Sequence, residues 1–455
     1  MFRRILIANR GEVAVRIIRT LREMNIESVL VCSEADRDSL AAMMATRAVC
    51  IGPDRASESY LKQEVILETA KRLGCEAIHP GYGFLSENAD FAENCRKCGL
   101  VFIGPDPEVI RLMGDKQAAR SLMEASGVPV VPGSRGLVRD PEQALRAAED
   151  IGYPVLLKAS AGGGGKGIRA VTCREELPEA FRSAAAEADA AFGDASLYLE
   201  KQILSPRHIE VQLLADRSGT VAALGERDCS LQRNHQKLLE ESPALFLSPE
   251  LKKQMEVAAV RAAKAAGYTS AGTVEFLLDR NGRFYFIEMN TRLQVEHPVT
   301  EALTGLDLVR EQIRIAAGLP LQWGGEEETR CSTGHAIECR INALGPGRVE
   351  ALHFPGGPGV RVDSWIYAGC RITPFYDALL AKIIVTGKTR LEAVRRLRRA
   401  LEELVVEEVQ TDAAFLHLLT YHREFLKGGA DTGFWERNHE EIERWMKEGA
   451  AEHEA

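Results

Sequence analysis

Residues 273–298, TVEFLLDRNGRFYFIEMNTRLQVEHP, decide how the rest of the chain is organised. Two apolar and aromatic runs flank Asn281-Gly282, and Asn-Gly between such runs predicts a β-hairpin. If Asn281-Gly282 forms a two-residue loop, counting outward sets Glu275 opposite Glu288 on the neighbouring strand. The pattern therefore predicts two carboxylates side by side.

The paired carboxylates predict a metal site. Cross-strand neighbours lie roughly 4.5–5.5 Å apart at Cβ, where like charges repel unless a cation stands between them. Asn290, two residues beyond Glu288, projects from the same face. Such oxygen ligands suit Mg²⁺ or Mn²⁺ that also binds nucleotide phosphates. The alternative is a solvated acidic hairpin, but both strands are otherwise apolar on both faces, so we expect buried carboxylates that need a partner.

More polar residues follow the hairpin at alternate positions. They are Arg292, Gln294 and Glu296. If the chain stays extended here, we expect all of them to lie along the same side as Glu288 and Asn290.

Composition limits the classes of function. A length of 455 residues suggests about three domains, and a net charge of −9 argues against nucleic-acid binding as the main task. No apolar run approaches the roughly 20 residues of a membrane span, and the first residues do not resemble a signal peptide, so we expect a cytosolic protein. Among the ten cysteines, Cys95-Arg96-Lys97-Cys98 could bind metal or act in redox chemistry, but a plain helix end is favoured.

The first 33 residues predict a βαβ unit, the start of a parallel sheet. The first strand is followed by Asn9-Arg10-Gly11-Glu12 instead of GxGxxG, which argues against a dehydrogenase. The turn at residues 79–84, HPGYGF, lies at the carboxyl end of a strand, where such sheets bind ligands. A tight glycine turn with packed aromatics is the open alternative.

The middle of the chain predicts a glycine flap. A boundary falls near residues 111–116, and strands are expected at 153–159 and 168–171 around Gly162-Gly163-Gly164-Gly165-Lys166-Gly167. A strand follows where a Walker A loop needs a helix, so we expect a flap whose N–H groups approach phosphate, with a simple loop tip as the alternative. The polar run at 227–243 is typical of a solvated loop or helix, and a helix over 251–267 is expected to end at Gly267.

Several motifs resemble one known family when read in order. They are IANRGE (7–12), HPGYGFLSEN (79–88), MGDK (113–116), KASAGGGGKG (158–167), HIEVQ (208–212), ERDCSLQRNHQK (226–237), FIEMNTRLQVEHPVTE (286–301) and ECRINA (338–343). The chain resembles the ATP-grasp enzymes and, within them, the biotin carboxylases. This resemblance implies an α/β fold with a Rossmann-like domain (1–113), an ATP-grasp domain (114–330) whose glycine-rich lid spans about 131–205, and an α+β C-terminal domain (331–447).

The resemblance also implies roles for individual residues. ATP would be bound by Lys116, Lys158, Gly164, Gly165, Glu200, Lys201, Ile203, His208, Gln232 and His235. The metal ions, two Mg²⁺ or Mn²⁺, would be held by Glu275, Glu288 and Asn290. Bicarbonate would be bound by Lys237, Arg292, Gln294 and Val295. The catalytic residues would be Arg292, Glu296, Lys237 and Arg340, with Glu296 as the base, and biotin would meet Tyr82 and Arg340.

The implied reaction is ATP-dependent carboxylation of biotin through carboxyphosphate, in a subunit of acetyl-CoA carboxylase. The alternatives are the same half-reaction in a pyruvate or propionyl-CoA carboxylase, or a non-catalytic nucleotide-binding subunit. No Met-Lys-Met occurs, so biotin is expected on a separate carrier protein, with carboxyltransferase subunits as further partners and a homodimer as the assembly.

Two features of the last third leave questions open. Leu344-Gly345-Pro346-Gly347 replaces a longer loop usual in the family, so that loop's role is not transferred. Thr389-Arg390-Leu391-Glu392 predicts a capped helix to about residue 404. Its arginines at 395, 396, 398 and 399 predict a solvated face, with docking of an acidic carrier as the sharper alternative.

Overall fold

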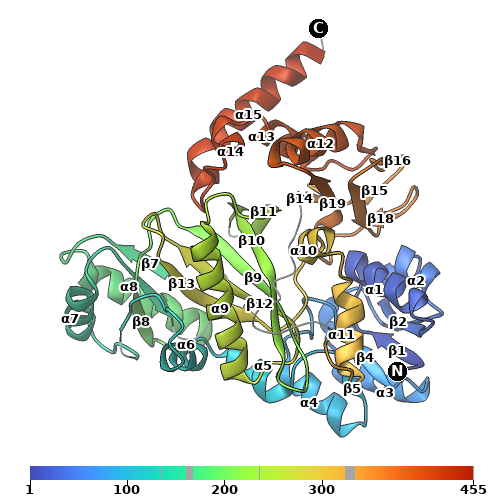
Figure 1. Cartoon of the computed structure of the whole chain (residues 1–455), viewed down its shortest axis with the longest axis horizontal. Helices are drawn as coiled ribbons and strands as arrows, with labels where there is room; N and C mark the ends of the chain where they lie inside the picture. Colours follow the sequence, from blue (N-terminus) through green and yellow to red (C-terminus); the bar gives the residue numbers. More distant parts are fainter. Residues whose placement is uncertain (135, 160–167, 235, 323–333, 454–455) are drawn as a thin grey trace.

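The computed structural model describes residues 1–134, 136–159, 168–234, 236–322 and 334–453. Its N-terminal part is a parallel sheet of order β3-β2-β1-β4-β5 flanked by helices (Figure 1). The elements are β1 (Arg4–Ile7), α1 (Gly11–Glu23), β2 (Glu27–Ser33), α2 (Leu40–Met44), β3 (Arg47–Gly52), α3 (Gln63–Arg72), β4 (Ala77–His79), α4 (Ala89–Lys97), β5 (Val101–Phe102) and α5 (Pro107–Gly114). The predicted βαβ opening is confirmed. The carboxyl ends of the adjacent strands β1 and β4 form the switch point of the sheet, where ligands bind.

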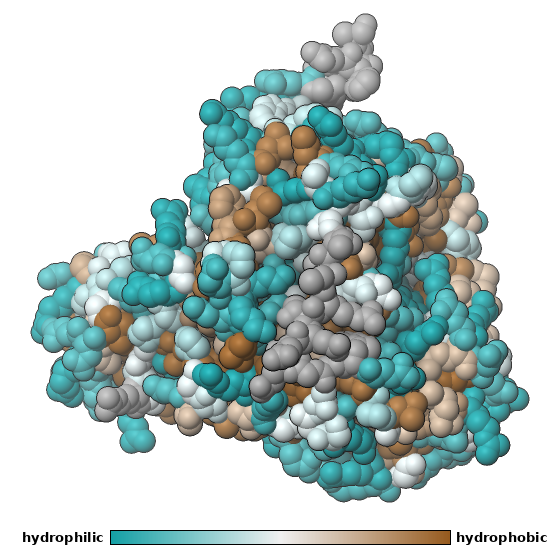
Figure 2. Space-filling view, in the orientation of Figure 1, coloured by the Kyte–Doolittle hydropathy of each residue, from teal (hydrophilic) through white to brown (hydrophobic). Residues whose placement is uncertain are grey.

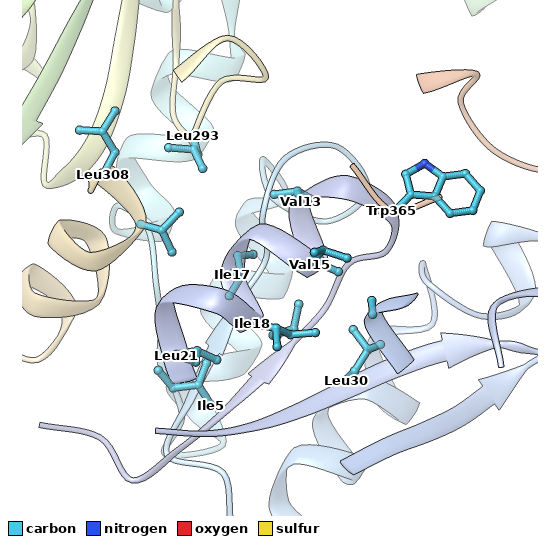
Figure 3. Packing of buried hydrophobic residues seen from close by; sticks show 14 of the residues in the cluster. Ile5, Val13, Val15, Ile17, Ile18, Leu21, Leu30, Leu293, Leu308 and Trp365 are labelled. Carbon is cyan, nitrogen blue, oxygen red and sulfur yellow. The ribbon is translucent and has the colours of Figure 1, made fainter. Parts of the chain in front are cut away.

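Helix α1 forms the centre of the largest core cluster. Val13, Ile17 and Leu21 belong to the same cluster as the sheet residue Ile5 and are all at most 1% exposed. Figure 3 shows Leu293, Leu308 and Trp365 in the same cluster, although they come from much later in the chain. Because apolar burial is the main stabilising contribution, this shared core fixes the N-terminal sheet against the rest of the molecule.

The next part contains a small unit with a core of its own. It consists of α7 (Pro141–Ile151), β6 (Val155–Ala159), β7 (Ile168–Val171), α8 (Leu177–Phe192) and β8 (Leu197–Lys201), following α6 (Lys116–Ala125). The strands form an antiparallel sheet of order β7-β6-β8, and both helices pack on it, at the left of Figure 1. The strands predicted on either side of the glycine run are confirmed, while residues 160–167 lie outside the described residues.

An eight-stranded antiparallel sheet of order β13-β12-β9-β10-β11-β14-β19-β17 forms the body of the molecule. Its first part contains β9 (Arg207–Ala215), β10 (Val221–Arg233), β11 (Gln236–Ser242), α9 (Pro249–Ala266), β12 (Ser270–Leu278), β13 (Phe284–Asn290), α10 (His297–Thr304) and α11 (Leu308–Ala316). The second part contains β14 (His335–Asn342), β15 (Gly347–Arg348), β16 (Leu352–His353), β17 (Val360–Ser364), β18 (Arg371–Ile372), β19 (Leu379–Gly387), α12 (Arg390–Glu403), β20 (Val405–Val406), α13 (Ala413–Leu419), α14 (Arg423–Leu426) and α15 (Phe434–His453). Pairing of β11 with β14 makes one continuous sheet from segments that the sequence assigned to two domains.

The prediction that residues 227–243 form a solvated loop or helix is wrong. They form the end of β10 and all of β11, and Arg227 and Glu240 are both fully buried. Arg227 pairs with Glu210 of β9 and Glu240 pairs with Arg340 of β14, because buried charges need partners. The polar composition of residues 227–243 therefore gave no indication that they form parts of two core strands.

The hairpin prediction is right in its strands and wrong in its loop. The backbone N–H of Asp279 donates to the carbonyl of Arg283 at 2.8 Å, so the loop has three residues and ends at Gly282 with φ of +77°. One extra residue in β13, Ile287, then bulges out between the pairs Phe276–Phe286 and Glu275–Glu288. The bulge offsets the longer loop, and the predicted pairing of Glu275 with Glu288 is confirmed.

Local helix signals are largely confirmed. Gly267 ends α9 with φ of +63°, and Thr389 accepts the N–H of Glu392 at the start of α12. Cys98 ends α4, and burial raises the pKa of the Cys95 thiol to about 12, so this pair forms a plain helix end.

The arginine face of α12 is only half solvated. Arg395 and Arg399 are exposed as predicted, whereas Arg396 and Arg398 donate to backbone carbonyls of Thr386 and Thr420. Figure 2, drawn in the orientation of Figure 1, shows that hydrophilic residues predominate on the face toward the viewer, with smaller apolar patches among them. Among the described helices, none combines the length and the apolar character needed to cross a bilayer.

Candidate active site

A cavity of about 1210 Å³ lies where the N-terminal sheet, the long sheet and the C-terminal strands meet. Tyr82 lines it from the turn after β4, while Glu275 and Glu288 come from the β12–β13 hairpin and Arg340 from β14. The turn at residues 79–84 thus lies at a ligand-sized cavity, which favours its binding role over simple packing. Asn9 orients this turn by donating to the carbonyls of Pro80 and Tyr82 at 2.6 and 2.7 Å.

The predicted metal ligands converge as expected. Asn290 donates to Glu275 at 2.9 Å, and both residues are buried. Although burial opposes it, Lys237 and His208 hold the pKa of Glu275 well below its usual value. Burial and the charge of Glu275 raise the pKa of Glu288, for which no hydrogen bond or ion pair occurs among the described residues. An unmatched carboxylate beside an ionised one fits a hard divalent cation.

Lys237 joins the metal-ligand group to the proposed base. Its ammonium lies 2.7 Å from Glu210, 3.0 Å from Glu275 and 2.6 Å from Glu296. Glu296 is fully buried, and its second oxygen accepts from Arg340 at 2.9 Å. Burial opposes ionisation, but Lys237 and Arg340 hold the pKa of Glu296 well below its usual value. The structure thus presents a buried carboxylate whose basicity is set by two neighbouring cations.

The polar residues after the hairpin converge by hydrogen bonds and not by extended geometry. Strand β13 ends at Asn290, so the expected extended chain to Glu296 is wrong. Arg292 instead donates to Asn290 and Gln294, each at 3.0 Å, and to Glu87 at 2.8 Å. The turn still brings the guanidinium and the amide to the cavity.

Tyr82 and Arg340 both line the cavity, from segments far apart in the sequence. The Tyr82 hydroxyl donates to buried Glu12 at 2.6 Å, and Glu12 lies 3.1 Å from the ammonium of Lys382. That ammonium also donates to the carbonyl of Val295 at 2.8 Å. Fully buried Lys382 therefore ties the proposed biotin side to the proposed bicarbonate side.

The residues predicted to bind ATP fall into two groups. His208 and Gln232 line the cavity and are joined at 2.8 Å. Lys158 of β6 pairs with Glu200 of β8, and neither residue is part of the cavity lining. The ammonium of Lys201 donates to the carbonyls of Gly152 and Tyr153. Exposed Lys116 and half-buried Ile203 are not part of that lining, although the charge of Lys116 acts on Glu288. Gly164, Gly165 and His235 are outside the described residues.

Sequence reasoning missed a set of buried charged residues that hold the site. They are Glu12, Glu210, Arg227, Glu240, Glu338 and Lys382. One signal was available, because Lys382 stands alone in the apolar run LLAKIIV (379–385), and an unpaired lysine in a core strand requires a partner. The carboxylates gave no such signal, since their partners come from distant segments.

Family models cover nearly the whole chain. The model described as Biotin carboxylase, N-terminal domain matches residues 1–110, Carbamoyl-phosphate synthase L chain, ATP binding domain matches 115–323, and Biotin carboxylase C-terminal domain matches 338–437. The chain is 52% identical over 445 residues to "Biotin carboxylase 1" of Bacillus subtilis, covering 96% of this chain and 98% of that one. It is 49% identical to a protein of Methanothermobacter thermautotrophicus that is named as one of the subunits of pyruvate carboxylase, covering 98% and 92%.

Solved structures agree with these matches. The biotin carboxylase–β,γ-ATP complex from Campylobacter jejuni is 44% identical, with a TM-score of 0.91 over 96% of this chain and 99% of that chain. The biotin carboxylase domain dimer of the Hydrogenobacter thermophilus 2-oxoglutarate carboxylase, in complex with MgADP, ADP and bicarbonate, is 47% identical, with a TM-score of 0.91 over 97% and 99%.

Proposed function

This chain belongs to the biotin carboxylase family and is an ATP-dependent enzyme, and we propose that it carboxylates biotin on a separate carrier protein with bicarbonate. The observation that carries the proposal is Glu296, buried and ionised between Lys237 and Arg340 in the main cavity. This arrangement suits removal of a proton from a small anion.

Glu296 is the proposed base. Bicarbonate is a poor nucleophile, so its proton must be removed as it attacks the γ-phosphate of ATP. In the structure Lys237 and Arg340 lower the pKa of Glu296, which makes it a weak base. When these cations turn toward bicarbonate and biotin, they stabilise Glu296 less, and its basicity rises when substrate is bound. Lys237, Arg292, Gln294 and the backbone at Val295 are the proposed bicarbonate contacts.

Glu275, Glu288 and Asn290 would hold Mg²⁺ or Mn²⁺, and the unpartnered Glu288 carboxylate fits that role. The ions would offset charge on the phosphates of ATP. Lys116, Lys158, Glu200, Lys201, Ile203, His208, Gln232 and His235, with Gly164 and Gly165, are the proposed nucleotide contacts. Lys158 and Arg120 already lie at the Glu200 carboxylate, Arg120 at 3.5 Å.

Arg340 and Tyr82 are the proposed contacts of the biotin ureido ring. Carboxyphosphate would break down to CO₂ and phosphate, and the ureido nitrogen would lose its proton before attacking CO₂. Arg340 would stabilise the developing charge on the ureido oxygen, a task for which a permanently charged guanidinium is well suited.

As the final acceptor of the carboxyl group we propose acetyl-CoA, in an acetyl-CoA carboxylase where this chain would act with a carrier protein and carboxyltransferase subunits. The relative named for pyruvate carboxylase keeps that second acceptor open. A non-catalytic nucleotide-binding subunit is disfavoured because Glu296, Arg292 and every proposed metal ligand are retained. The dimer described for the Hydrogenobacter domain supports a homodimer, and the matched ranges support three domains at about 1–113, 114–330 and 331–447.

The test is ADP release by the purified chain with ATP, Mg²⁺ and bicarbonate, with and without free biotin. We expect ADP only when bicarbonate is present, and faster release with biotin. ATP binding without bicarbonate-dependent cleavage would reject the proposal and favour the regulatory alternative.

A further inference from the structure

Glu338 lies in the centre of β14 and is fully buried, yet neither of its carboxylate oxygens has a hydrogen-bond partner among the described residues. Its strand neighbours Ile337 and Cys339 belong to the core cluster that includes α12. Since side chains alternate along a strand, Glu338 and Arg340 both face the opposite side, where α10 packs on β14. The unpartnered carboxyl thus lies on the same face of β14 as Arg340, which lines the cavity.

The cations near Glu338 are committed to other acceptors. Arg340, two residues along β14, binds Glu240 at 2.7 Å and Glu296 at 2.9 Å. Lys382, the cross-strand partner of Arg340 on β19, binds the carbonyl of Val295 and the carboxylate of Glu12. No cation of the described chain pairs with Glu338 itself.

The residue directly opposite Glu338 is another carboxyl. Glu240 on β11 is its cross-strand partner, and one oxygen of Glu240 is also buried without a partner. The charge of Glu296, just before α10, also acts on Glu338. At the start of α10, burial keeps the pKa of His297 well below its usual value, so His297 adds no positive charge. A second ionised carboxylate here would meet repulsion and an uncompensated loss of hydration.

Burial, Glu240 and Glu296 raise the pKa of Glu338 well above its usual value, and burial raises that of Glu240 to about 7. We propose that Glu338 is a positioning residue that stays protonated during turnover, so that Arg340 is shared by two carboxylates and remains free to reach the ureido oxygen. This inference rests on the proposed function, because it concerns the availability of Arg340 for biotin. An ionised Glu338 would be a third competitor for the same guanidinium.

The consequence is a pH limit on the biotin step. As pH rises, Glu338 loses its proton and holds Arg340 back, so biotin-dependent turnover falls. Glutamine reproduces the uncharged carboxyl and cannot ionise. In Glu338→Gln we therefore expect the alkaline limb of kcat/KM for biotin to move upward by at least about one pH unit. Bicarbonate-dependent ATP cleavage without biotin does not need Arg340 at the ureido oxygen, and its alkaline limb should stay in place.

Glu256 provides a matched control. It is a buried glutamate on α9 with one unpartnered oxygen, and burial raises its pKa, but its charged neighbours are Lys252 and Glu226. Infrared difference spectra at neutral pH should lose one carboxylic C=O band in Glu338→Gln, and that band should remain in Glu256→Gln. Only Glu338→Gln should move the alkaline limb for biotin.

An unmoved limb in Glu338→Gln, or an unchanged carboxylic band, would overturn the inference. A folded Glu338→Gln that is inactive at every pH, with activity restored by Glu338→Asp, would also overturn it by showing that an ionised carboxylate is needed. If neither Glu338 variant folds, pH titration of the carboxylic C=O band in Glu256→Gln, which retains Glu338, decides the protonation state. A wild-type chain that lacks bicarbonate-dependent ATP cleavage would instead reject the proposed function, while the infrared result would still report on Glu338.

Discussion

Replacing the fully buried Arg227 by methionine should cost both stability and activity. Arg227 donates to Glu210 at 2.6 Å, Gln212 at 2.8 Å, Thr300 at 2.7 Å and Thr273 at 3.3 Å. Methionine fills part of the volume but leaves these acceptors without a donor. Breaking a buried ion pair by removing one partner costs roughly 3–5 kcal/mol. We expect a loss of that size in the free energy of unfolding.

The same substitution should also disturb the positions of the proposed catalytic residues. The second oxygen of Glu210 accepts from Lys237 at 2.7 Å, so a displaced Glu210 no longer aims that ammonium at Glu296. Loss of one charge-assisted hydrogen bond, worth roughly 1.5–3 kcal/mol, corresponds to a drop of about 10- to 100-fold in kcat/KM.

The assay is urea unfolding followed by circular dichroism, together with bicarbonate-dependent ADP release. The control is Arg283→Met, which removes an exposed ion pair to Asp279 and should leave both measurements nearly unchanged. A loss below about 1 kcal/mol for Arg227→Met, with normal turnover, would refute the view that this buried arginine holds Glu210 and Lys237 in place.

Three further changes test the site and its electrostatics. Glu288→Gln should abolish metal-dependent turnover while circular dichroism remains that of the folded chain, and normal activity at ordinary Mg²⁺ would remove the metal site. Arg340→Ser should reduce biotin carboxylation far more than bicarbonate-dependent ATP cleavage, whereas equal losses would contradict its assigned role. The Arg361 guanidinium donates twice to the buried Asp363 and, against the effect of burial, lowers its pKa to about 2. Because this pKa lies below the unfolded value, the stabilisation is present above about pH 4 and is lost as pH falls toward 2. Asp363→Asn should therefore lower stability at pH 7 by about 2 kcal/mol and by little at pH 2, as measured by urea unfolding at both pH values.

The metal ligands could be predicted from the sequence because the information is local. Two strands joined by a short turn place Glu275 and Glu288 opposite each other, and the carboxylates stand out in apolar strands. The two-residue loop was nevertheless wrong, and only the Ile287 bulge restored the register. A bulge depends on packing against the neighbouring sheet, which a hairpin pattern does not encode.

The buried charge network could not be predicted in the same way. The partners Arg340 and Glu296 are 44 residues apart, and Lys382 and Val295 are 87 apart. The charged residues of segment 227–243 therefore looked like those of a solvated loop, although they pair inside the core.

The sequence by itself determined the parallel N-terminal sheet, the carboxylate hairpin and the family, because each depends on short-range periodicity or on motifs read along the chain. The tertiary structure decided which charges meet, since β11 and β14 pair across segments about 100 residues apart and bring Glu240 to Arg340. It also decided that Glu338 is buried without a cation. Protonation is a property of surroundings, and those surroundings exist only after distant strands have joined.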